Sequence, residues 1–251
     1  MEKTVALVTG GAKRVGRAIA LDLARHSFNL AIHHRPGTDV APFAAELEAA
    51  GARAVLLPAD LNATEDCGTL IRRATEALGP VRLLVNNASI FEDDTAADFD
   101  WSNWDQHFAL HLKAPVELTR RFAEALPQGA EGLVVNIIDQ RVWRLTPRFF
   151  SYTLSKSALW TATQTMAQSF APRIRVNAIG PGPTLKNARQ SEEDFSAQID
   201  ALLLGRGPEL SEFGATIRYL WEARSITGQM IALDGGQHLA WATPDIAGIR
   251  E

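Results

Sequence analysis

The sequence predicts an α/β protein in which seven mainly parallel strands form a doubly wound sheet with helices on both faces. Two observations favour this class. Seven short apolar runs recur along the chain, and most are continuous, as in strands buried on both faces. Helical patterns rich in alanine and leucine lie between them, so that strand and helix alternate. No repeat or linker interrupts this order, which indicates a single domain over residues 1–251.

The expected strands are rich in valine, leucine, isoleucine and alanine. They cover residues 4–10, 29–34, 53–60, 81–89, 132–139, 173–180 and 229–236. Helical patterns occupy 17–26, 43–52 and 67–79, the last ended by Gly-Pro. The longest irregular stretch, 181–195, follows the sixth strand, and a helical pattern resumes near Ala197. It is either a solvated surface loop or a lid over a ligand, within a substrate loop at about 183–210.

The composition is that of a globular protein. The 251 residues are 46% hydrophobic and 22% charged, enough for a sizeable core. A net charge of −4 gives no support for a nucleic-acid or anionic-membrane surface. The single cysteine, Cys67, allows no intrachain disulfide, and we expect a cytoplasmic setting. No apolar stretch approaches the ~20 residues that span a bilayer, and no secretion signal is apparent.

A glycine-rich turn follows the first expected strand and opens the first helix. It reads TGGAKRVG at 9–16 and contains Gly10, Gly11 and Gly16. Such turns bind phosphate through backbone N–H groups. Strand, turn and helix in this order form the pyrophosphate site of a Rossmann-type sheet. Arg14, however, stands where a further glycine is expected.

The end of the second strand indicates which nucleotide binds. A cofactor without a 2′-phosphate usually meets Asp or Glu there, but this chain reads His33, His34, Arg35. A guanidinium favours a phosphate dianion over a free ribose. We therefore expect NADP(H), with Arg14 and Arg35 flanking its 2′-phosphate. The alternative is that both arginines are simply exposed at the surface.

Six motifs along almost the whole chain resemble the short-chain dehydrogenase/reductase family. They are TGGAKRVG (9–16), ADL (59–61), NNAS (86–89), YTLSK (152–156), RVNAIGPGPT (175–184) and ITGQMIALDGG (226–236). Within the family, the closest resemblance is to pteridine reductases and bacterial dihydromonapterin reductases, also called alternative dihydrofolate reductases.

Three features carry this closer resemblance. The first is Arg14 in the glycine turn, together with HHR after the second strand. The second is Asp139, thirteen residues before Tyr152, where most members of the family have a catalytic serine. The third is NNASIF, with Ser89 in place of the usual glycine and Phe91 two residues later. In pteridine reductases this phenylalanine stacks on the pterin.

The resemblance implies NADPH-dependent hydride transfer to the C=N bond of a dihydropterin, with protonation of the neighbouring nitrogen. The catalytic residues are then Asp139, Tyr152 and Lys156. Lys156 lies one helical turn after Tyr152, and we expect its ammonium to lower the pKa of the phenol from its usual ~10. A carboxyl whose pKa is raised by burial can donate a proton, so Asp139 and Tyr152 are expected to share a proton-supplying network.

The remaining implied residues bind the two small molecules. The cofactor set is Gly10, Arg14, Val15, Gly16, His34, Arg35, Asp60, Leu61, Asn87, Ala88, Ser89, Tyr152, Lys156, Pro181 and Gly182. The substrate set is Arg14, Ser89, Phe91, Asp139, Tyr152 and Pro183. Arg14 is thus expected to contact both cofactor phosphate and the pterin edge, and Phe91 to offer the ring a flat apolar face. No metal site is expected.

One position departs from the wider family. Where an asparagine usually kinks a helix and holds a relay water, this chain has His111. That histidine resembles the dihydromonapterin branch and is either part of the relay or satisfied by backbone groups. Arg141, Trp143, Arg144 and Arg148 are expected to border the substrate pocket or a subunit contact. The resemblance also implies a homotetramer.

Two other functions remain open. One is an NADPH-dependent carbonyl or 3-oxoacyl reductase of the same family, which Asp139 and Phe91 disfavour. The other is an NADP(H)-binding regulator without catalysis, which Tyr152 and Lys156 disfavour. A nucleic-acid-binding role is disfavoured by the acidic balance. The preferred pterin side chain does not follow from the sequence.

Overall fold

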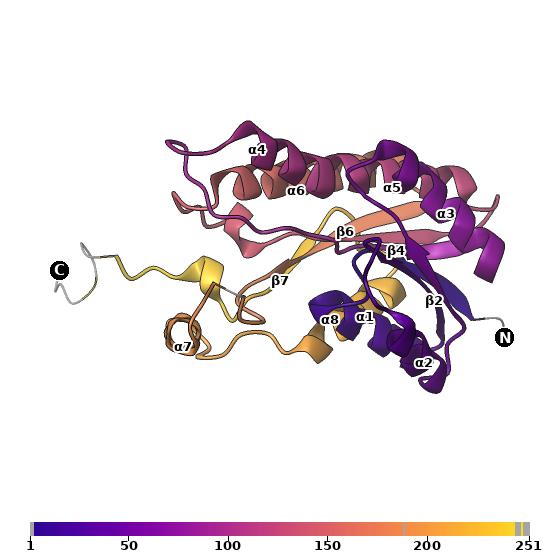
Figure 1. Cartoon of the computed structure of the whole chain (residues 1–251), viewed down its shortest axis with the longest axis horizontal. Coiled ribbons are helices and arrows are strands. Elements are labelled where there is room, and N and C mark those ends of the chain that lie inside the picture. The colour runs from indigo at the N-terminus through magenta and orange to yellow at the C-terminus, as the bar shows by residue number, and fades with distance from the viewer. Residues whose placement is uncertain (1–2, 188, 244–246, 248–251) are drawn as a thin grey trace.

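The computed structural model describes residues 3–187, 189–243 and 247, and contains one parallel sheet (Figure 1). Its seven strands follow the order β3-β2-β1-β4-β5-β6-β7, which confirms the predicted fold class. They are β1 (Thr4–Val8), β2 (Phe28–His34), β3 (Ala54–Pro58), β4 (Val81–Asn86), β5 (Gly132–Ile137), β6 (Ile174–Pro181) and β7 (Met230–Leu233).

Helices cover both faces of this sheet (Figure 1). One layer holds α3 (Thr64–Leu78), α4 (Trp101–Phe108), α5 (Ala114–Ala125) and α6 (Phe150–Phe170). The other holds α1 (Arg14–Arg25), α2 (Ala41–Ala49) and α8 (Leu210–Glu222). Each layer closes its own apolar core, around Leu70, Phe122 and Val134 on one side and Ile19, Val85 and Phe213 on the other. Burial on both faces explains why the strands read as continuous apolar runs.

Several strands end earlier than their apolar runs suggested. β4 ends at Asn86 and β5 at Ile137, so that Asn87–Ser89 and Asp139 lie just beyond the sheet. Residues at the carboxyl ends of parallel strands meet at one edge. The polar residues that follow each strand are therefore brought together by the topology.

The segment between β6 and α8 contains a helix of its own, α7 (Glu192–Asp200), which lies apart from the two layers (Figure 1). It begins earlier than the helical pattern expected near Ala197. The Ser191 hydroxyl accepts a hydrogen bond from the Asp194 N–H, and the Asp194 carboxylate accepts one from the Ser191 N–H. This capping box starts the helix inside a stretch whose polar composition suggested a loop.

Among the residues that the structure describes, no helix is both long and apolar enough to cross a membrane.

Candidate active site

A pocket with a volume of about 1250 Å³ opens at the carboxyl ends of the strands. The strand order reverses between β1 and β4, and open α/β sheets bind ligands at such a switch point. Every residue predicted for the cofactor, the substrate and catalysis lines this single pocket. The structure therefore brings all of them together, although it does not by itself assign their roles.

The glycine turn between β1 and α1 has the shape that its sequence predicts. Gly10 has φ +59°, and a Cβ on Gly16 would lie 2.4 Å from the Gly10 carbonyl oxygen. Arg14 has φ +50°, a left-handed conformation that glycine adopts without strain and arginine does not. An arginine thus occupies a glycine-like position at the N-terminus of α1. The free N–H groups there suit an anion.

A buried histidine holds this turn, and sequence reasoning missed it. The His33 Nδ1 accepts a hydrogen bond from the Gly10 N–H at 3.0 Å, and its Nε2 lies 3.2 Å from the Ala59 carbonyl oxygen. Nδ1 must be unprotonated to accept, so Nε2 carries the proton and donates to Ala59. Burial lowers the pKa of His33 to about 4, which keeps this neutral tautomer at physiological pH. A polar residue inside an otherwise apolar strand was the available signal.

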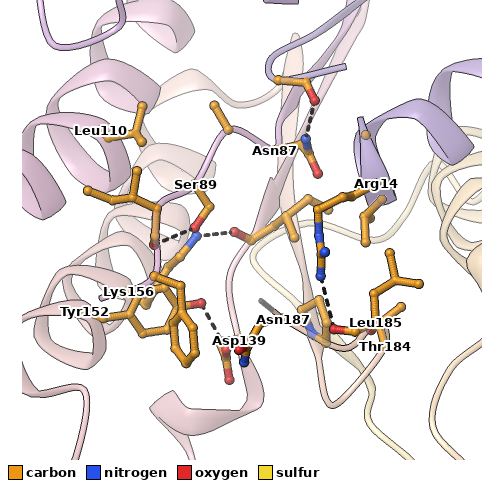
Figure 2. Close-up of a pocket in the computed structure, with 18 of the residues that line it drawn as sticks. Arg14, Asn87, Ser89, Leu110, Asp139, Tyr152, Lys156, Thr184, Leu185 and Asn187 are labelled. Atoms are coloured by element: carbon orange, nitrogen blue, oxygen red, sulfur yellow. Dashed lines mark hydrogen bonds between the residues drawn. The ribbon is translucent and has the colours of Figure 1, made fainter. Parts of the chain in front are cut away.

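The amide of Asn87 closes the turn from the other side. Its Nδ2 donates to the carbonyl oxygens of Thr9 at 2.9 Å and Gly10 at 3.2 Å. Ser89 and Asn87 project from the chain after β4 toward the pocket (Figure 2). The segment after β4 therefore supports the glycine turn as well as lining the cavity.

The two arginines expected to flank one phosphate lie in different surroundings. Arg35 is exposed directly after β2 and lines the pocket. The Arg14 guanidinium instead donates to the carbonyl oxygens of Leu185 at 3.1 Å and Lys186 at 3.2 Å, in the loop after β6 (Figure 2). In this structure Arg14 bridges the glycine turn and the predicted substrate loop. That both arginines flank one 2′-phosphate stays a prediction.

The three predicted catalytic side chains come from α6 and from the segment that follows β5. The Tyr152 hydroxyl donates to the Asp139 Oδ2 at 2.9 Å (Figure 2). The other carboxyl oxygen, Oδ1, accepts from the Arg141 N–H at 2.8 Å. The Lys156 ammonium donates to the Ile137 carbonyl oxygen at 2.8 Å, on the same face of α6 as Tyr152. The predicted contact between Asp139 and Tyr152 is present, and it is direct.

The electrostatics differ from the expectation for the phenol. Burial, reinforced by the neighbouring Asp139 carboxyl, raises the pKa of Tyr152 well above its usual value. Burial also lowers the pKa of Lys156 to about 8. The predicted lowering of the Tyr152 pKa by Lys156 is therefore not found in this structure: burial and the Asp139 carboxyl raise that pKa, and the groups that oppose them are Arg141 and Ser89. Tyr152 is a neutral phenol here.

The Asp139 carboxyl has the raised pKa that the sequence suggested. Burial is the main cause, while the backbone N–H of Arg141 opposes it by hydrogen bonding the charged form. The Asp139 carboxyl and the Tyr152 phenol are thus both buried, both have raised pKa values, and share a hydrogen bond. Such a pair can hold exchangeable protons within the pocket.

His111 lies in a π-helical turn, Ala109–Lys113, between α4 and α5. Both nitrogens of its ring form hydrogen bonds. The Ser155 hydroxyl donates to the Tyr152 carbonyl oxygen at 2.7 Å, so its oxygen accepts from His111 Nδ1–H at 2.8 Å. Nε2 then accepts from the Ile90 N–H at 3.2 Å. Burial lowers the pKa of His111 well below its usual value. A neutral histidine therefore ties the chain after β4 to α6.

Phe91 forms an aromatic wall beside this group. Its ring stacks on Phe149 with centroids 4.2 Å apart and meets Tyr152 edge-on at 4.7 Å. Phe149 has φ +59° and lies immediately before α6. One face of Phe91 is thus covered by Phe149, which fixes the orientation of the ring next to the phenol.

Comparison with known proteins places these features in context. A model of the short chain dehydrogenase family matches residues 4–196. Among curated proteins, 2-dehydro-3-deoxy-D-gluconate 5-dehydrogenase of Escherichia coli is 32% identical over 94% of this chain and 96% of its own. A 3-oxoacyl acyl-carrier-protein reductase, FabG, of Staphylococcus epidermidis is 27% identical over 93% of this chain and 98% of its own.

Solved structures include nearer relatives. FolM alternative dihydrofolate reductase 1 from Brucella suis, in complex with NADP, is 58% identical, with a TM-score of 0.94. The alignment covers 97% of this chain and 98% of that one. The Brucella canis protein of the same description, also complexed with NADP, is 57% identical, with a TM-score of 0.91. It covers the same shares of the two chains. These likenesses confirm the predicted resemblance to alternative dihydrofolate reductases.

Proposed function

The chain belongs to the short-chain dehydrogenase family, and we propose that it is an NADPH-dependent reductase of dihydropterins. The reaction is hydride transfer to the C=N bond of a dihydropterin such as dihydromonapterin or dihydrofolate, which gives the tetrahydro form. The observation that carries this proposal is the hydrogen bond between Tyr152 and Asp139. The FolM structures, at 57–58% identity, support the same substrate class.

The pocket fits NADP(H). In the turn from Gly10 to Gly16 there is no room for a Cβ at Gly16, and the N–H groups at the start of α1 face outward, as a pyrophosphate requires. Arg35 supplies a cation after β2 for the 2′-phosphate, and no carboxylate stands at that strand end. The buried ammonium of Lys156 is placed to bind the nicotinamide ribose. When bound, NADPH supplies the hydride.

The protein's own residues orient the pterin and manage its proton. We assign Phe91, which meets the phenol edge-on, to the pterin ring. Reduction at carbon leaves an electron pair on the neighbouring nitrogen, and that nitrogen takes a proton. When Asp139 is protonated, the carboxyl and the Tyr152 phenol together hold two protons. The pair can give one to the ring nitrogen and keep the other in their mutual hydrogen bond.

The second candidate is a carbonyl or 3-oxoacyl reductase, favoured by the FabG relatives. One assay of the purified protein decides between them. We expect NADPH consumption with dihydrofolate or dihydromonapterin, and little with a panel of ketones and 3-oxoacyl thioesters. Rapid turnover of ketones with none of the pterins would refute the substrate class. NADPH binding without turnover of any substrate would indicate a regulator. A homotetramer stays a prediction from the family.

The pKa directions at the site predict how the rate depends on pH. The proton-donating form of Asp139 is lost as pH rises through its raised pKa, and the Lys156 ammonium is lost as pH rises through about 8. Both losses act in the same direction, so kcat for pterin reduction should fall as the pH increases. The measurement is a pH–rate profile of wild type and of Asp139→Asn.

The Asp139→Asn variant distinguishes the titration of Asp139 from that of Lys156. Asp139→Asn has no carboxyl to titrate, so its lower rate should fall only where Lys156 titrates. A wild-type rate that climbs through pH 8 would contradict the assignment of proton donation to this network.

A further inference from the structure

Three arginines surround the stacked rings at the mouth of the pocket. Arg141 lies over Phe149 at 4.9 Å and over Phe91 at 5.7 Å. Arg148 lies over Phe149 at 5.3 Å, and Arg189 lies over Phe91 at 5.7 Å. All five side chains line the pocket. Guanidinium groups on aromatic faces are held in place there without losing their capacity to bind an anion.

The charges of two of these arginines are already balanced. Arg148 pairs with Asp93, and Arg189 pairs with Glu92, two acids that directly follow Phe91. Within the described part of the chain, no carboxylate lies within ion-pair distance of the Arg141 guanidinium. Its side-chain hydrogen bond is a long one, 3.5 Å to the Thr146 hydroxyl. Of these three arginines, Arg141 is therefore the one whose guanidinium is available to bind an additional anion.

Arg141 lies beside the residues that we expect to protonate the substrate. Its backbone N–H donates to the Asp139 carboxyl, and the Phe91 ring contacts both its guanidinium and the Tyr152 ring. In a 6-substituted dihydropterin, the carbon that receives hydride also carries the side chain. That side chain must therefore leave the ring beside Asp139 and Tyr152. In dihydrofolate, one aromatic ring separates the pterin methylene from a glutamate with two carboxylates.

We propose that Arg141 binds a carboxylate in the side chain of the substrate, so that the enzyme favours an acidic dihydropterin such as dihydrofolate over neutral ones. This inference rests on the proposed function. A guanidinium forms two parallel charge-assisted hydrogen bonds with a carboxylate, whereas a hydroxylated neutral chain gains only ordinary ones.

The test compares two substrates in two variants. Arg141→Gln should raise KM for dihydrofolate about tenfold, the loss of one such ion pair, and change KM for neutral dihydromonapterin less than about twofold. Any effect transmitted through Asp139 instead changes kcat for both substrates alike. The matched control is Arg144→Gln. Contrary to the expectation from the sequence, Arg144 does not line the pocket, and its guanidinium donates to the Gln237 carbonyl oxygen. This control variant should leave both KM values unchanged.

A second readout does not depend on turnover. Binding of folate to the enzyme with NADP⁺ should weaken with added salt in wild type, and much less so in Arg141→Gln. Equal changes in KM for both substrates, or none for dihydrofolate, would overturn the carboxylate site while leaving pterin reduction intact. If wild type reduces neither pterin, the proposed function itself fails, and this inference fails with it.

Discussion

Replacing Tyr152 by phenylalanine should lower kcat for pterin reduction about 10³-fold while leaving the affinity for NADPH within about threefold of wild type. The substitution removes one hydroxyl and keeps the ring that packs edge-on against Phe91. The lost hydroxyl donates a hydrogen bond to the Asp139 carboxyl at 2.9 Å. Without it, the developing charge on the ring nitrogen has only the carboxyl to neutralise it. Single-turnover measurement of NADPH oxidation reports the chemical step directly.

The chain offers a matched control for this variant. Tyr219 is the second of the two tyrosines, and its side chain is exposed on α8, away from the pocket lining. Tyr219→Phe should leave both kcat and NADPH affinity unchanged. Stability should fall by only about 1 kcal/mol in Tyr152→Phe, because Asp139 keeps the N–H of Arg141 as a partner. A Tyr152→Phe enzyme with more than about a tenth of wild-type kcat would remove the phenol from the proposed proton path.

The fold was predictable because burial acts on whole segments. Residues within β2 such as Leu30–Ile32 are buried on both faces, which leaves a continuous apolar run, and the helical patterns between such runs identify them as strands. The location of the residues that follow the strands was predictable from the parallel order of those strands. Asp139 and Asn87 had to lie at one edge once the strands were parallel. The start of α7 was missed because a capping box depends on hydrogen bonds between polar side chains and backbone, which composition alone does not reveal.

The site was less predictable where two physical effects oppose each other. At Tyr152, an ammonium one helical turn away favours the phenolate, but burial disfavours it, and only the structure shows that burial prevails. The direction of the Arg14 side chain depends on a left-handed backbone and on carbonyl groups that lie far along the chain. His33 was missed because its hydrogen bond joins β2 to Gly10 in the turn after β1. These contacts join residues that are far apart in the sequence, so a local sequence pattern does not predict them.

The second large effect concerns the charge at the end of β2. Arg35→Glu should weaken NADPH binding about 10²-fold and NADH binding at most about threefold. Arg35 lines the pocket directly after the strand, where a carboxylate would accept hydrogen bonds from an unphosphorylated ribose. Glutamate therefore removes an attraction for the 2′-phosphate and adds a repulsion, while it leaves NADH a partner for its ribose hydroxyls. Equilibrium titration of each nucleotide, followed by fluorescence, gives the two dissociation constants.

The control must alter charge without altering the pocket, and Arg25→Glu does so. Arg25 ends α1, is exposed and lies outside the pocket lining, so its replacement changes the net charge by the same amount. It should weaken NADPH less than about twofold, since exposed charges at that distance are screened by salt. Equal losses of NADPH and NADH in Arg35→Glu would mean that the residue supports the fold of the turn rather than the phosphate. Selectivity for NADPH would then have to come from the neighbouring Lys13 or Arg14, and the contact of Arg14 with Leu185 would have to break to provide it.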